Sequence, residues 1–426
     1  MNIPSNLIKF KVYFFYGIMF LIVVFCIELL SQLTFFIIFG KKYSPMNLKN
    51  YIASKYNDTD VKAEFMKTEI IHPYVGYVYD YKNEKDNYST HGFFTATPLV
   101  KREEGTINIV VLGGSVAKEL TKYIEQSWKK TFRIKPRLIN LAIYGYKEPQ
   151  QLLALTYFLA LGAEYDLVIN IDGFNDIVLP YAENYAAGIN PFFPRSWKLM
   201  LTKNPTHKEL ALVGKLKYFQ DIKRERLAEL SGSIFHGSAT YGVIKTVQLM
   251  INNQEIYDSY KALLALQREL PKRFDESGPV KQYADAAEMH ADAAAVWYRS
   301  SLLINSLAKD NGFEYYHFLQ PDQYLEGSKR LTGEEQRLAF NAKHMYRQSV
   351  VIGYPMLIDK GKMLEKNQVN FFDATMIFAK VAETVYCDDC CHFNKRGNQI
   401  LADYIIQQIS RHNKLEKLQV AGALPD

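Results

Sequence analysis

The sequence lacks several features that mark common classes of protein. No long basic run is present, and the net charge of +6 is spread along the 426 residues, so we expect no nucleic-acid partner. No internal repeats, no low-complexity tract and no G-x-x-x-x-G-K-[ST] phosphate-binding motif occur. Nothing in the sequence calls for a cofactor. The remaining composition, 48% hydrophobic and 23% charged, is ordinary for a globular protein with a sizeable core.

Charged residues are nearly absent between Val12 and Gly40, where Glu28 is the single one. A helix needs about 20 mostly apolar residues to span a bilayer, so we predict a membrane anchor over residues 1–42. The run is too long for the apolar core of a cleaved signal peptide, and no small-x-small cleavage site follows it. Glu28 opposes insertion by roughly 2–4 kcal/mol, which the surrounding apolar residues offset. The alternative is a buried helix of a soluble protein.

Lysines flank the apolar run on both sides (Lys9 and Lys11 before it, Lys41 and Lys42 after it). The positive-inside rule therefore gives no orientation. No second run of this length follows. We expect a single-pass membrane protein whose remaining chain lies wholly on one side of the membrane.

Three apolar runs further along the chain end in glycine-containing loops: Ile107–Gly114, Arg137–Gly145 and Tyr165–Gly173. Segments with helical character separate them. This alternation predicts a parallel β-sheet covered by helices on both faces. In such sheets ligands bind off the carboxyl ends of the strands, which is where these loops lie. The three loops together are the first indication of a functional site.

Helical and charged sequence interrupts the sheet pattern at about residues 181–300, and apolar runs return at Phe313–Tyr324 and Asn367–Thr375. We therefore predict one α/β domain over residues 106–412 with a helical insertion, placed as a lid beside the site. The other expected segments are the anchor, a connector and a C-terminal tail (residues 1–42, 43–105 and 413–426).

Ser115 follows the first apolar run, in the stretch "LGGSVA". A serine at a strand end becomes a nucleophile if an oriented histidine reaches it, and the oxyanion that then develops needs preorganised donors. The backbone N–H groups of Ser115 and Gly145 and the side-chain amide of Asn175, in "GFND", suit that purpose. Glycine at position 145 lets the backbone approach a substrate closely.

Near the C-terminus, the stretch "DDCCHFN" places Asp389 three residues before His392. Across one turn, a carboxylate at this spacing can hold one imidazole nitrogen and leave the other directed outward as a base. Asp388, four residues before His392, is expected to point elsewhere. The predicted catalytic residues are therefore Ser115, Asp389 and His392.

In their order along the chain, these blocks resemble those of the SGNH/GDSL hydrolases, over residues 106–412. The family's serine block, lone glycine, Gly-x-Asn-Asp block and terminal Asp-x-x-His read here as "LGGSVA", "NLAIYG", "GFND" and "DCCH". One departure is that Gly114 stands where the family has the aspartate of Gly-Asp-Ser, a residue outside the triad. The resemblance implies a flavodoxin-like, three-layer α/β/α sandwich with about five parallel strands, and ester hydrolysis through an acyl-enzyme.

Each block also has an ordinary structural interpretation. A lone Gly-Gly-Ser is commonly a turn, "GFND" a capped helix start, and "DCCH" a loop; their combination in order favours catalysis. His317, in "YYHFLQP", falls within a predicted strand and is therefore expected in the core.

Three of the four cysteines, Cys387, Cys390 and Cys391, surround the predicted triad, whereas Cys26 lies in the apolar run. The Cys-x-x-Cys-Cys-His pattern suggests zinc, but a structural zinc site needs a second pair of ligands, which the sequence lacks, so no metal is expected. An oxidising compartment would allow a disulfide involving Cys387, which would rigidify this loop.

The sequence-based hypothesis is a membrane-anchored serine esterase of a bacterial cell envelope. The anchor would lie in the inner membrane and the catalytic domain in the periplasm or outside the cell. By analogy with the family, an O-acetylated cell-surface polysaccharide is the first substrate to consider. The alternatives are an O-acyltransferase that passes the same acyl group to a glycan, and a non-catalytic envelope scaffold.

Overall fold

The computed structural model of the chain describes residues 5–48, 69–82, 88–201, 206–233, 235–269 and 274–415. The chain divides into two compact units. The first contains Met1–Thr59 and Val213–Tyr260, and the second contains Asp60–Leu212 and Lys261–Asp426. Most of the predicted C-terminal tail, and part of the predicted connector, lie outside the described residues.

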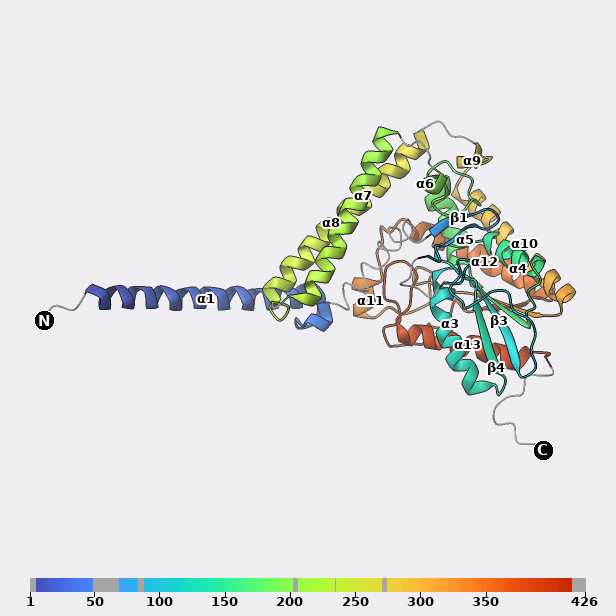
Figure 1. Cartoon of the computed structure of the whole chain (residues 1–426), viewed down its shortest axis with the longest axis horizontal. Coiled ribbons are helices and arrows are strands. Elements are labelled where there is room, and N and C mark those ends of the chain that lie inside the picture. Colours follow the sequence, from blue (N-terminus) through green and yellow to red (C-terminus); the bar gives the residue numbers. More distant parts are fainter. Residues whose placement is uncertain are drawn as a thin grey trace. The chain divides into compact units, whose positions relative to one another are not determined.

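The second unit is built on a sheet of five parallel strands (Figure 1), which confirms the predicted α/β class. The strand order across the sheet is β4-β3-β5-β6-β7. The strands are β3 (Thr106–Gly113), β4 (Lys135–Asn140), β5 (Leu167–Asp172), β6 (Glu314–Leu319) and β7 (Asn370–Asp373). Because both faces of a parallel sheet are covered, its central strands are apolar along most of their length; every residue of β5 is buried.

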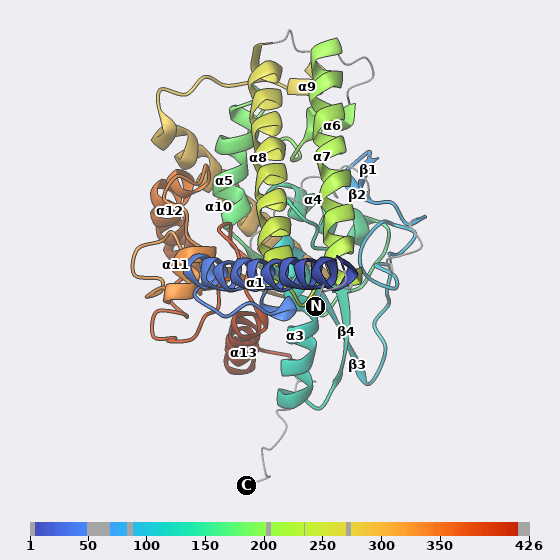
Figure 2. The ribbon, with the colours of Figure 1, turned by 90° about the vertical axis from the view of Figure 1, so that its left-hand side faces the viewer.

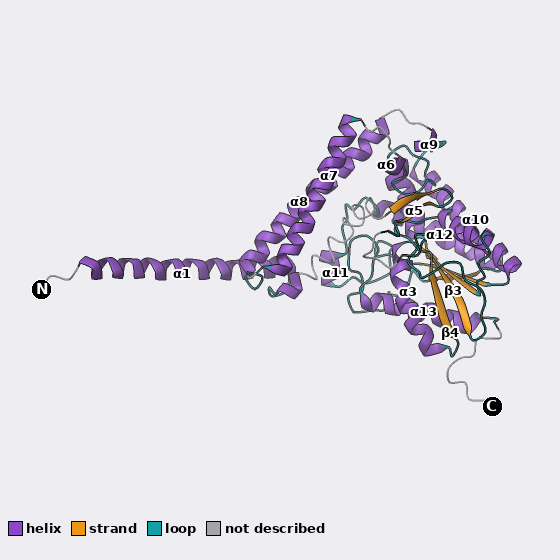
Figure 3. Cartoon of the chain, in the orientation of Figure 1, coloured by secondary structure: helices purple, strands orange, loops and turns teal. Residues whose placement is uncertain are grey.

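Helices pack on the sheet in two groups, because crossovers between parallel strands are right-handed. The chain runs from β3 to its neighbour β4 through α3 (Ser115–Thr131), which packs against the last helix, α13 (Lys395–His412). From β4 the chain returns past β3 and continues in the opposite direction. The helices on that path, α4 (Gln150–Ala160), α10 (Ala286–Asn311) and α12 (Arg347–Lys366), form the second group. Figure 3 shows the strands between these helices.

The direction of the chain reverses between β3 and β5, which are neighbours in the sheet. In open α/β sheets, the carboxyl ends of strands at such a reversal border a crevice where ligands bind. Ser115 directly follows the loop after β3, and Asn175 follows β5. The topology therefore brings together two residues that the sequence motifs singled out.

Part of the predicted connector forms an antiparallel hairpin, β1 (Glu69–His72) and β2 (Gly76–Tyr79). Tyr77 in β2 is fully buried, and its hydroxyl donates a hydrogen bond of 2.8 Å to the main-chain oxygen of Tyr144. Tyr144 lies in the loop after β4 and precedes Gly145. The hairpin is therefore part of the second unit and contacts the loop that carries Gly145.

The region between β5 and β6 is mainly helical, as expected, but it does not form one insertion. Helix α10 belongs to the core, where Trp297 and Ile304 are fully buried, so the predicted boundary near residue 300 is displaced. The middle of the region, Val213–Tyr260, belongs to the first unit. The second unit also contains the short helices α5 (Phe174–Leu179), α6 (Trp197–Leu201), α9 (Phe274–Ser277) and α11 (Gly333–Leu338) and the π-helical segment η1 (Pro180–Tyr185).

The first unit contains α1 (Ser5–Phe39) and most of a helical hairpin, α7 (His207–Gly232) and α8 (Ala239–Glu269). Within α1, Tyr13–Ile37 is long and apolar enough to cross a membrane, and no other helix in the described part of the chain is. The C-terminal end of α1 lies at the end of the hairpin where α7 and α8 are joined (Figure 1 and Figure 2).

The N-terminus of α8 binds Glu28, the one charged residue of the apolar run. The carboxylate accepts hydrogen bonds from the N–H groups of Ala239 (2.5 Å) and Thr240 (3.1 Å), and from the hydroxyls of Ser238 and Thr240 (2.8 Å each). The first N–H groups of a helix lack partners within it and carry partial positive charge. These contacts give the carboxylate partners that an apolar helix does not supply by itself.

Candidate active site

Ser115 is the first residue of α3, at the carboxyl end of β3. Its N–H has no acceptor within the helix, because it belongs to the first turn. Gly114 precedes it as the N-cap, and a Cβ at Gly114 would lie only 2.2 Å from Nδ2 of Asn175. Glycine is therefore required at position 114, because the Asn175 amide packs directly against it.

His392 reaches Ser115 from the loop that precedes α13. Its Nε2 lies 2.7 Å from Ser115 Oγ, although the two residues are 277 positions apart in the sequence. The loop is short and closed: Tyr386 and Phe393 form an antiparallel bridge, and the Cys387 N–H donates to the main-chain oxygen of His392 at 3.1 Å. The structure thus brings together two of the three predicted catalytic residues.

The carboxylate beside His392 belongs to Asp388 and not to Asp389, so the predicted partner is wrong by one residue. Oδ2 of Asp388 lies 2.5 Å from Nδ1 of His392. Its Oδ1 accepts hydrogen bonds from three consecutive N–H groups, those of Cys390 and Cys391 at 3.0 Å and of His392 at 3.1 Å. Because the chain winds around this carboxylate, the aspartate four positions before His392 reaches the ring.

The charges of Asp388 and His392 stabilise each other. Burial alone would lower the pKa of His392, but the Asp388 charge and hydrogen bond outweigh it and raise this pKa well above its ordinary value of 6.5. Burial alone would raise the pKa of Asp388, whereas the facing imidazole and the hydrogen bonds from the loop hold it below its ordinary value. The pair therefore favours a protonated imidazole, the form that arises when a histidine takes a proton from a serine.

Gly145 lies in the loop after β4, next to β3 in the sheet. Its φ of +76° lies in the left-handed region that favours glycine. A Cβ at this position would lie 2.7 Å from Cδ of Arg195 and 3.1 Å from the Tyr77 hydroxyl. Both the backbone conformation and the lack of space therefore require glycine.

The Tyr77 hydroxyl fixes the peptide that contains the Gly145 N–H. It donates to the main-chain oxygen of Tyr144, which belongs to the same trans peptide group. The C=O and N–H of a trans peptide point in opposite directions, so this hydrogen bond turns the Gly145 N–H away from the hairpin. Tyr146 makes a second link in the other direction, because its hydroxyl donates to the main-chain oxygen of Tyr77 at 2.6 Å.

Asn175, in the first turn of α5, is also held by the loop after β4. Its Nδ2 donates to the main-chain oxygen of Tyr146 at 2.9 Å, and a side-chain amide has a second N–H to donate. The next residue, Asp176, closes the turn by accepting from the N–H groups of Glu148 (2.6 Å) and Gly173 (3.0 Å). Burial raises the pKa of Asp176 to about 8.

A buried ion pair borders the Gly145 loop and was not anticipated from the sequence. Arg195 makes two hydrogen bonds of 2.8 Å with the carboxylate of Glu183, and the Tyr346 hydroxyl contacts both side chains. Such a bidentate pair fixes the plane of the guanidinium, which lies against Gly145. No motif marks Arg195 or Tyr77, because each acts through a contact distant in sequence.

A second serine, histidine and aspartate are hydrogen-bonded within the core. Ser301 Oγ, in α10, lies 2.8 Å from Nδ1 of His317 in β6, and Nε2 of His317 lies 2.8 Å from Oδ1 of Asp172 at the end of β5. Trp297 donates to the same carboxylate oxygen at 2.6 Å. The prediction that His317 belongs to the core is confirmed, but its partners were not anticipated.

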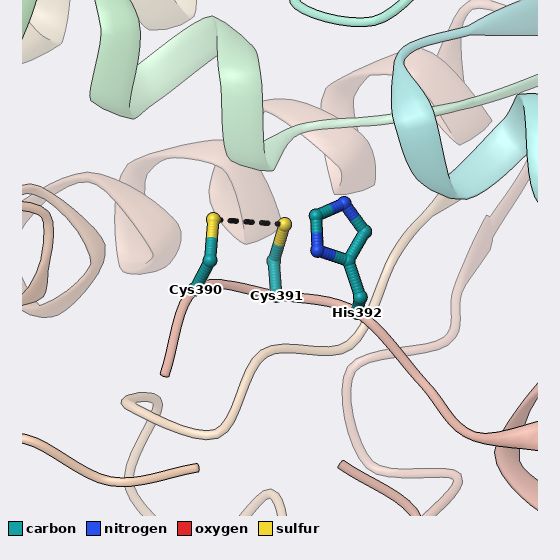
Figure 4. A group of neighbouring side chains, drawn as sticks. All are labelled: Cys390, Cys391 and His392. Carbon is teal, nitrogen blue, oxygen red and sulfur yellow. Dashed lines mark hydrogen bonds between the residues drawn. The ribbon is translucent and has the colours of Figure 1, made fainter. Parts of the chain in front are cut away.

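Figure 4 shows Cys390, Cys391 and His392, whose potential ligand atoms all lie within 4.8 Å of one another. The two sulfur atoms are 3.4 Å apart, and all four cysteines are free thiols, so the disulfide expected in this loop is not formed. Both ring nitrogens of His392 are already hydrogen-bonded, one to Asp388 and one to Ser115. A metal ion bound by this histidine would have to break one of these contacts.

No family model and no curated protein matches this sequence. The resemblance to the SGNH/GDSL hydrolases therefore depends on the sequence blocks alone.

Proposed function

We propose that the protein is a serine hydrolase that cleaves carboxylic esters, of the SGNH/GDSL type that its sequence blocks resemble. The observation that supports the proposal is the hydrogen-bonded series Ser115–His392–Asp388. Ser115 Oγ lies 2.7 Å from Nε2 of His392, and Nδ1 of His392 lies 2.5 Å from Oδ2 of Asp388. The series lies at the carboxyl edge of a parallel sheet, beside the reversal of the chain direction. This is the position and the order of groups that activate a serine for acyl transfer.

In the proposed reaction, Ser115 Oγ attacks the acyl carbonyl while Nε2 of His392 takes its proton. Asp388 stabilises the imidazolium that forms. The negative charge on the carbonyl oxygen is stabilised by the N–H groups of Ser115 and Gly145 and by the amide of Asn175. His392 then returns the proton to the leaving alcohol, which departs and leaves an ester of Ser115. A water molecule attacks this acyl-enzyme while His392 takes one of its protons. His392 then returns the proton to Ser115 Oγ as the acid is released, which regenerates the serine.

We propose that the apolar helix α1 anchors the protein in a membrane. The chain would be a single-pass protein of a bacterial inner membrane, with the second unit in the periplasm or outside the cell. O-acetylated cell-surface polysaccharide remains the first substrate to test. The length and apolar character of Tyr13–Ile37 support the membrane anchor.

The test begins with a fluorophosphonate probe, which forms a covalent adduct only with an activated serine. We expect a single modified peptide, containing Ser115, when the labelled protein is digested and analysed by mass spectrometry. Failure to label would contradict the proposal and favour a non-catalytic scaffold. Labelling at another serine would contradict the assignment of Ser115 as the nucleophile.

Substrates can then be distinguished with p-nitrophenyl esters of increasing acyl length and with acetylated glycans. Release of free acetate from a glycan identifies a hydrolase. Appearance of the acyl group on an added glycan acceptor identifies an O-acyltransferase, because both reactions share the acyl-enzyme and differ only in the nucleophile that resolves it.

A further inference from the structure

The contact between α1 and the α7–α8 hairpin lies at a defined depth if α1 crosses a membrane, as proposed above. Counting about 20 residues from Val12, the first residue after the last lysine of the flank, reaches Ser31. Glu28 is one helical turn before that end. Thr240, in the first turn of α8, contacts both residues: its Oγ1 donates to Glu28 at 2.8 Å and to Ser31 at 3.0 Å. The start of α8 therefore lies in the C-terminal half of the candidate span Tyr13–Ile37, close to the end of a hydrocarbon core of about 20 residues.

A second contact holds the same end of the hairpin against the last turns of α1. The Tyr43 hydroxyl donates to the main-chain oxygen of His236, in the turn between α7 and α8, at 2.7 Å. The Tyr43 ring packs edge-on against Phe35, which is fully buried, and it lies directly against Gly242 of α8. The tip of the hairpin is thus attached at two points and cannot leave this depth without breaking both.

The exposed side chains of α8 change character with distance from the tip. Ile244, Val247, Met250 and Ile251 are all exposed, by 43–57%. Positions separated by three, four and seven residues lie on one face of a helix. The next exposed residue is Gln254. The apolar face therefore covers only the first turns of α8, the part nearest to Glu28.

Helix α7 does not share this face. Its exposed residues at the same end of the hairpin include Arg224, Glu225 and Glu229. The hairpin is thus amphipathic between its two helices, with apolar side chains on α8 and charged side chains on α7. Phe235, in the connecting turn, is 62% exposed and extends the apolar side to the tip.

We propose that the first turns of α8, from Phe235 to Ile251, form a lipid-contacting surface that lies in the interface of the bilayer crossed by α1. Interfacial amphipathic helices bury their apolar face about 5–10 Å into the boundary between headgroups and acyl chains. A bilayer fits this surface because the first turn of α8 is hydrogen-bonded to Glu28 and Ser31 of α1, a helix whose side chains are mostly apolar and exposed. The change to polar exposure at Gln254 marks where α8 leaves the lipid.

The test uses the full-length protein in liposomes, with its four cysteines replaced by serine and with single cysteines introduced for an environment-sensitive fluorophore. The variants are Ile244→Cys, the matched position Gln254→Cys on the same helix, Glu225→Cys on α7, and Leu21→Cys within α1. At position 244 we expect a blue-shifted emission and about a twofold loss of fluorescence with spin-labelled lipids, as at position 21. Positions 225 and 254 should be quenched by aqueous iodide instead.

The controls separate the possible failures. If position 21 is quenched by spin-labelled lipids but position 244 behaves like position 225, the inference is wrong and the membrane anchor stands. If position 21 is also accessible to iodide, the proposed membrane crossing fails, and this inference fails with it. Neither result bears on the esterase proposal. Photolabelling of the unmodified protein with a lipid-soluble carbene precursor checks the same point without any substitution: the peptide that starts α8 should be labelled, and that of residues 224–229 should not.

Discussion

The described part of the chain contains two hydrogen-bonded sets of serine, histidine and aspartate, which differ in their surroundings. In the candidate site, Nε2 of His392 faces Ser115 and Nδ1 faces Asp388. In the core set, the ring is reversed, with Nδ1 of His317 facing Ser301. Distances between 2.5 and 2.8 Å join both sets, so hydrogen-bond length does not distinguish them.

The surroundings distinguish the two sets. Ser115 begins a helix at a strand end, where backbone N–H groups have no intrahelical partner. Ser301 lies in the interior of α10, where the backbone N–H groups bond within the helix. The His392 side chain is 12% exposed, whereas that of His317 is 1% exposed. A serine becomes a nucleophile where a substrate can reach it and where donors are free to bind the oxyanion. The three residue types by themselves do not suffice.

Removal of each serine hydroxyl in turn tests the difference between the two sets most directly. Ser115→Ala should reduce esterase activity about 10⁴-fold or more and abolish fluorophosphonate labelling, with the thermal unfolding temperature unchanged. Ser301→Ala should keep its activity and lose about 1–3 kcal/mol of unfolding free energy, because a buried nitrogen of His317 loses its partner. Kinetics and thermal denaturation of the purified variants provide the measurement. Inactive Ser301→Ala with wild-type stability would reverse the assignment.

Asp388 and Asp389 provide a matched pair of neighbouring carboxylates. Asp388→Asn should reduce kcat by about 10²–10⁴, because an amide favours the wrong tautomer of His392. Asp389→Asn should keep most of the wild-type kcat, since the carboxylate that is hydrogen-bonded to Nδ1 of His392 belongs to Asp388. Assays on p-nitrophenyl acetate decide between them. A larger loss in Asp389→Asn would restore the assignment made from the sequence.

Substitution of Asn175 tests whether oxyanion donors distinguish the Ser115 set from the Ser301 set. Asn175→Ala should lower kcat by about 10²–10³ with little change in KM, because the donor acts mainly in the transition state. The same steady-state assay measures both constants. A change confined to KM would make Asn175 a substrate-binding residue.

Tyr77 and Tyr146 test whether the position of the Gly145 N–H matters for catalysis. Each donates one buried hydroxyl hydrogen bond between the hairpin and the loop, but only that of Tyr77 reaches the peptide containing the Gly145 N–H. We expect Tyr77→Phe to lower kcat about tenfold at constant KM, a part of the loss caused by removing a donor altogether. Tyr146→Phe should show a similar loss of stability without that loss of kcat. Equal effects on kcat would reduce Tyr77 to a packing role.

The smallest expected effect concerns pH. His392 must be neutral to take the serine proton, and its pKa is raised well above 6.5. Activity should therefore fall as the pH falls through this raised pKa, so that kcat/KM rises with pH on the alkaline side of 6.5. Asp388→Asn removes the charge that raises the pKa and should shift the rise to lower pH. Rates of fluorophosphonate labelling across the pH range measure both proteins. A wild-type rise centred at or below 6.5 would contradict the expectation.

Local patterns in the sequence were sufficient to predict the strands and the candidate site residues that follow them. The apolar runs before Ser115, Gly145 and Asn175 predicted parallel strands, and the carboxyl ends of such strands meet at one edge. The aspartate could not be predicted from spacing. Three N–H groups that converge on Asp388 Oδ1 set the course of the loop, and this requires the folded backbone.

Contacts between distant parts of the chain account for the other differences. Tyr77 lies in a short hairpin whose role depends on Tyr144, 67 positions later. Helix α10 looks like the other charged helices of its region, yet Trp297 buries it against the sheet, 125 positions from its partner Asp172. Periodicity shows that a helix has an apolar face, but it does not show which surface covers that face.

The short closed loop that ends at His392 has a consequence for the dynamics of the protein. Asp388 and His392 are held together by contacts within this loop, and Ser115, in a different element, meets His392 through one side-chain hydrogen bond. The loop is also tied to the segment after β6, because Gln323 and Tyr324 donate to the main-chain oxygens of Asp388 and Asp389. Proteins open in local cooperative segments before they unfold as a whole. Opening of this loop would withdraw the base and its carboxylate together, with the sheet and the serine still in place. Because Cys390 and Cys391 are buried in the core, such an opening would expose apolar surface. We therefore expect it to be rare, so that the base stays beside Ser115 in nearly all folded molecules.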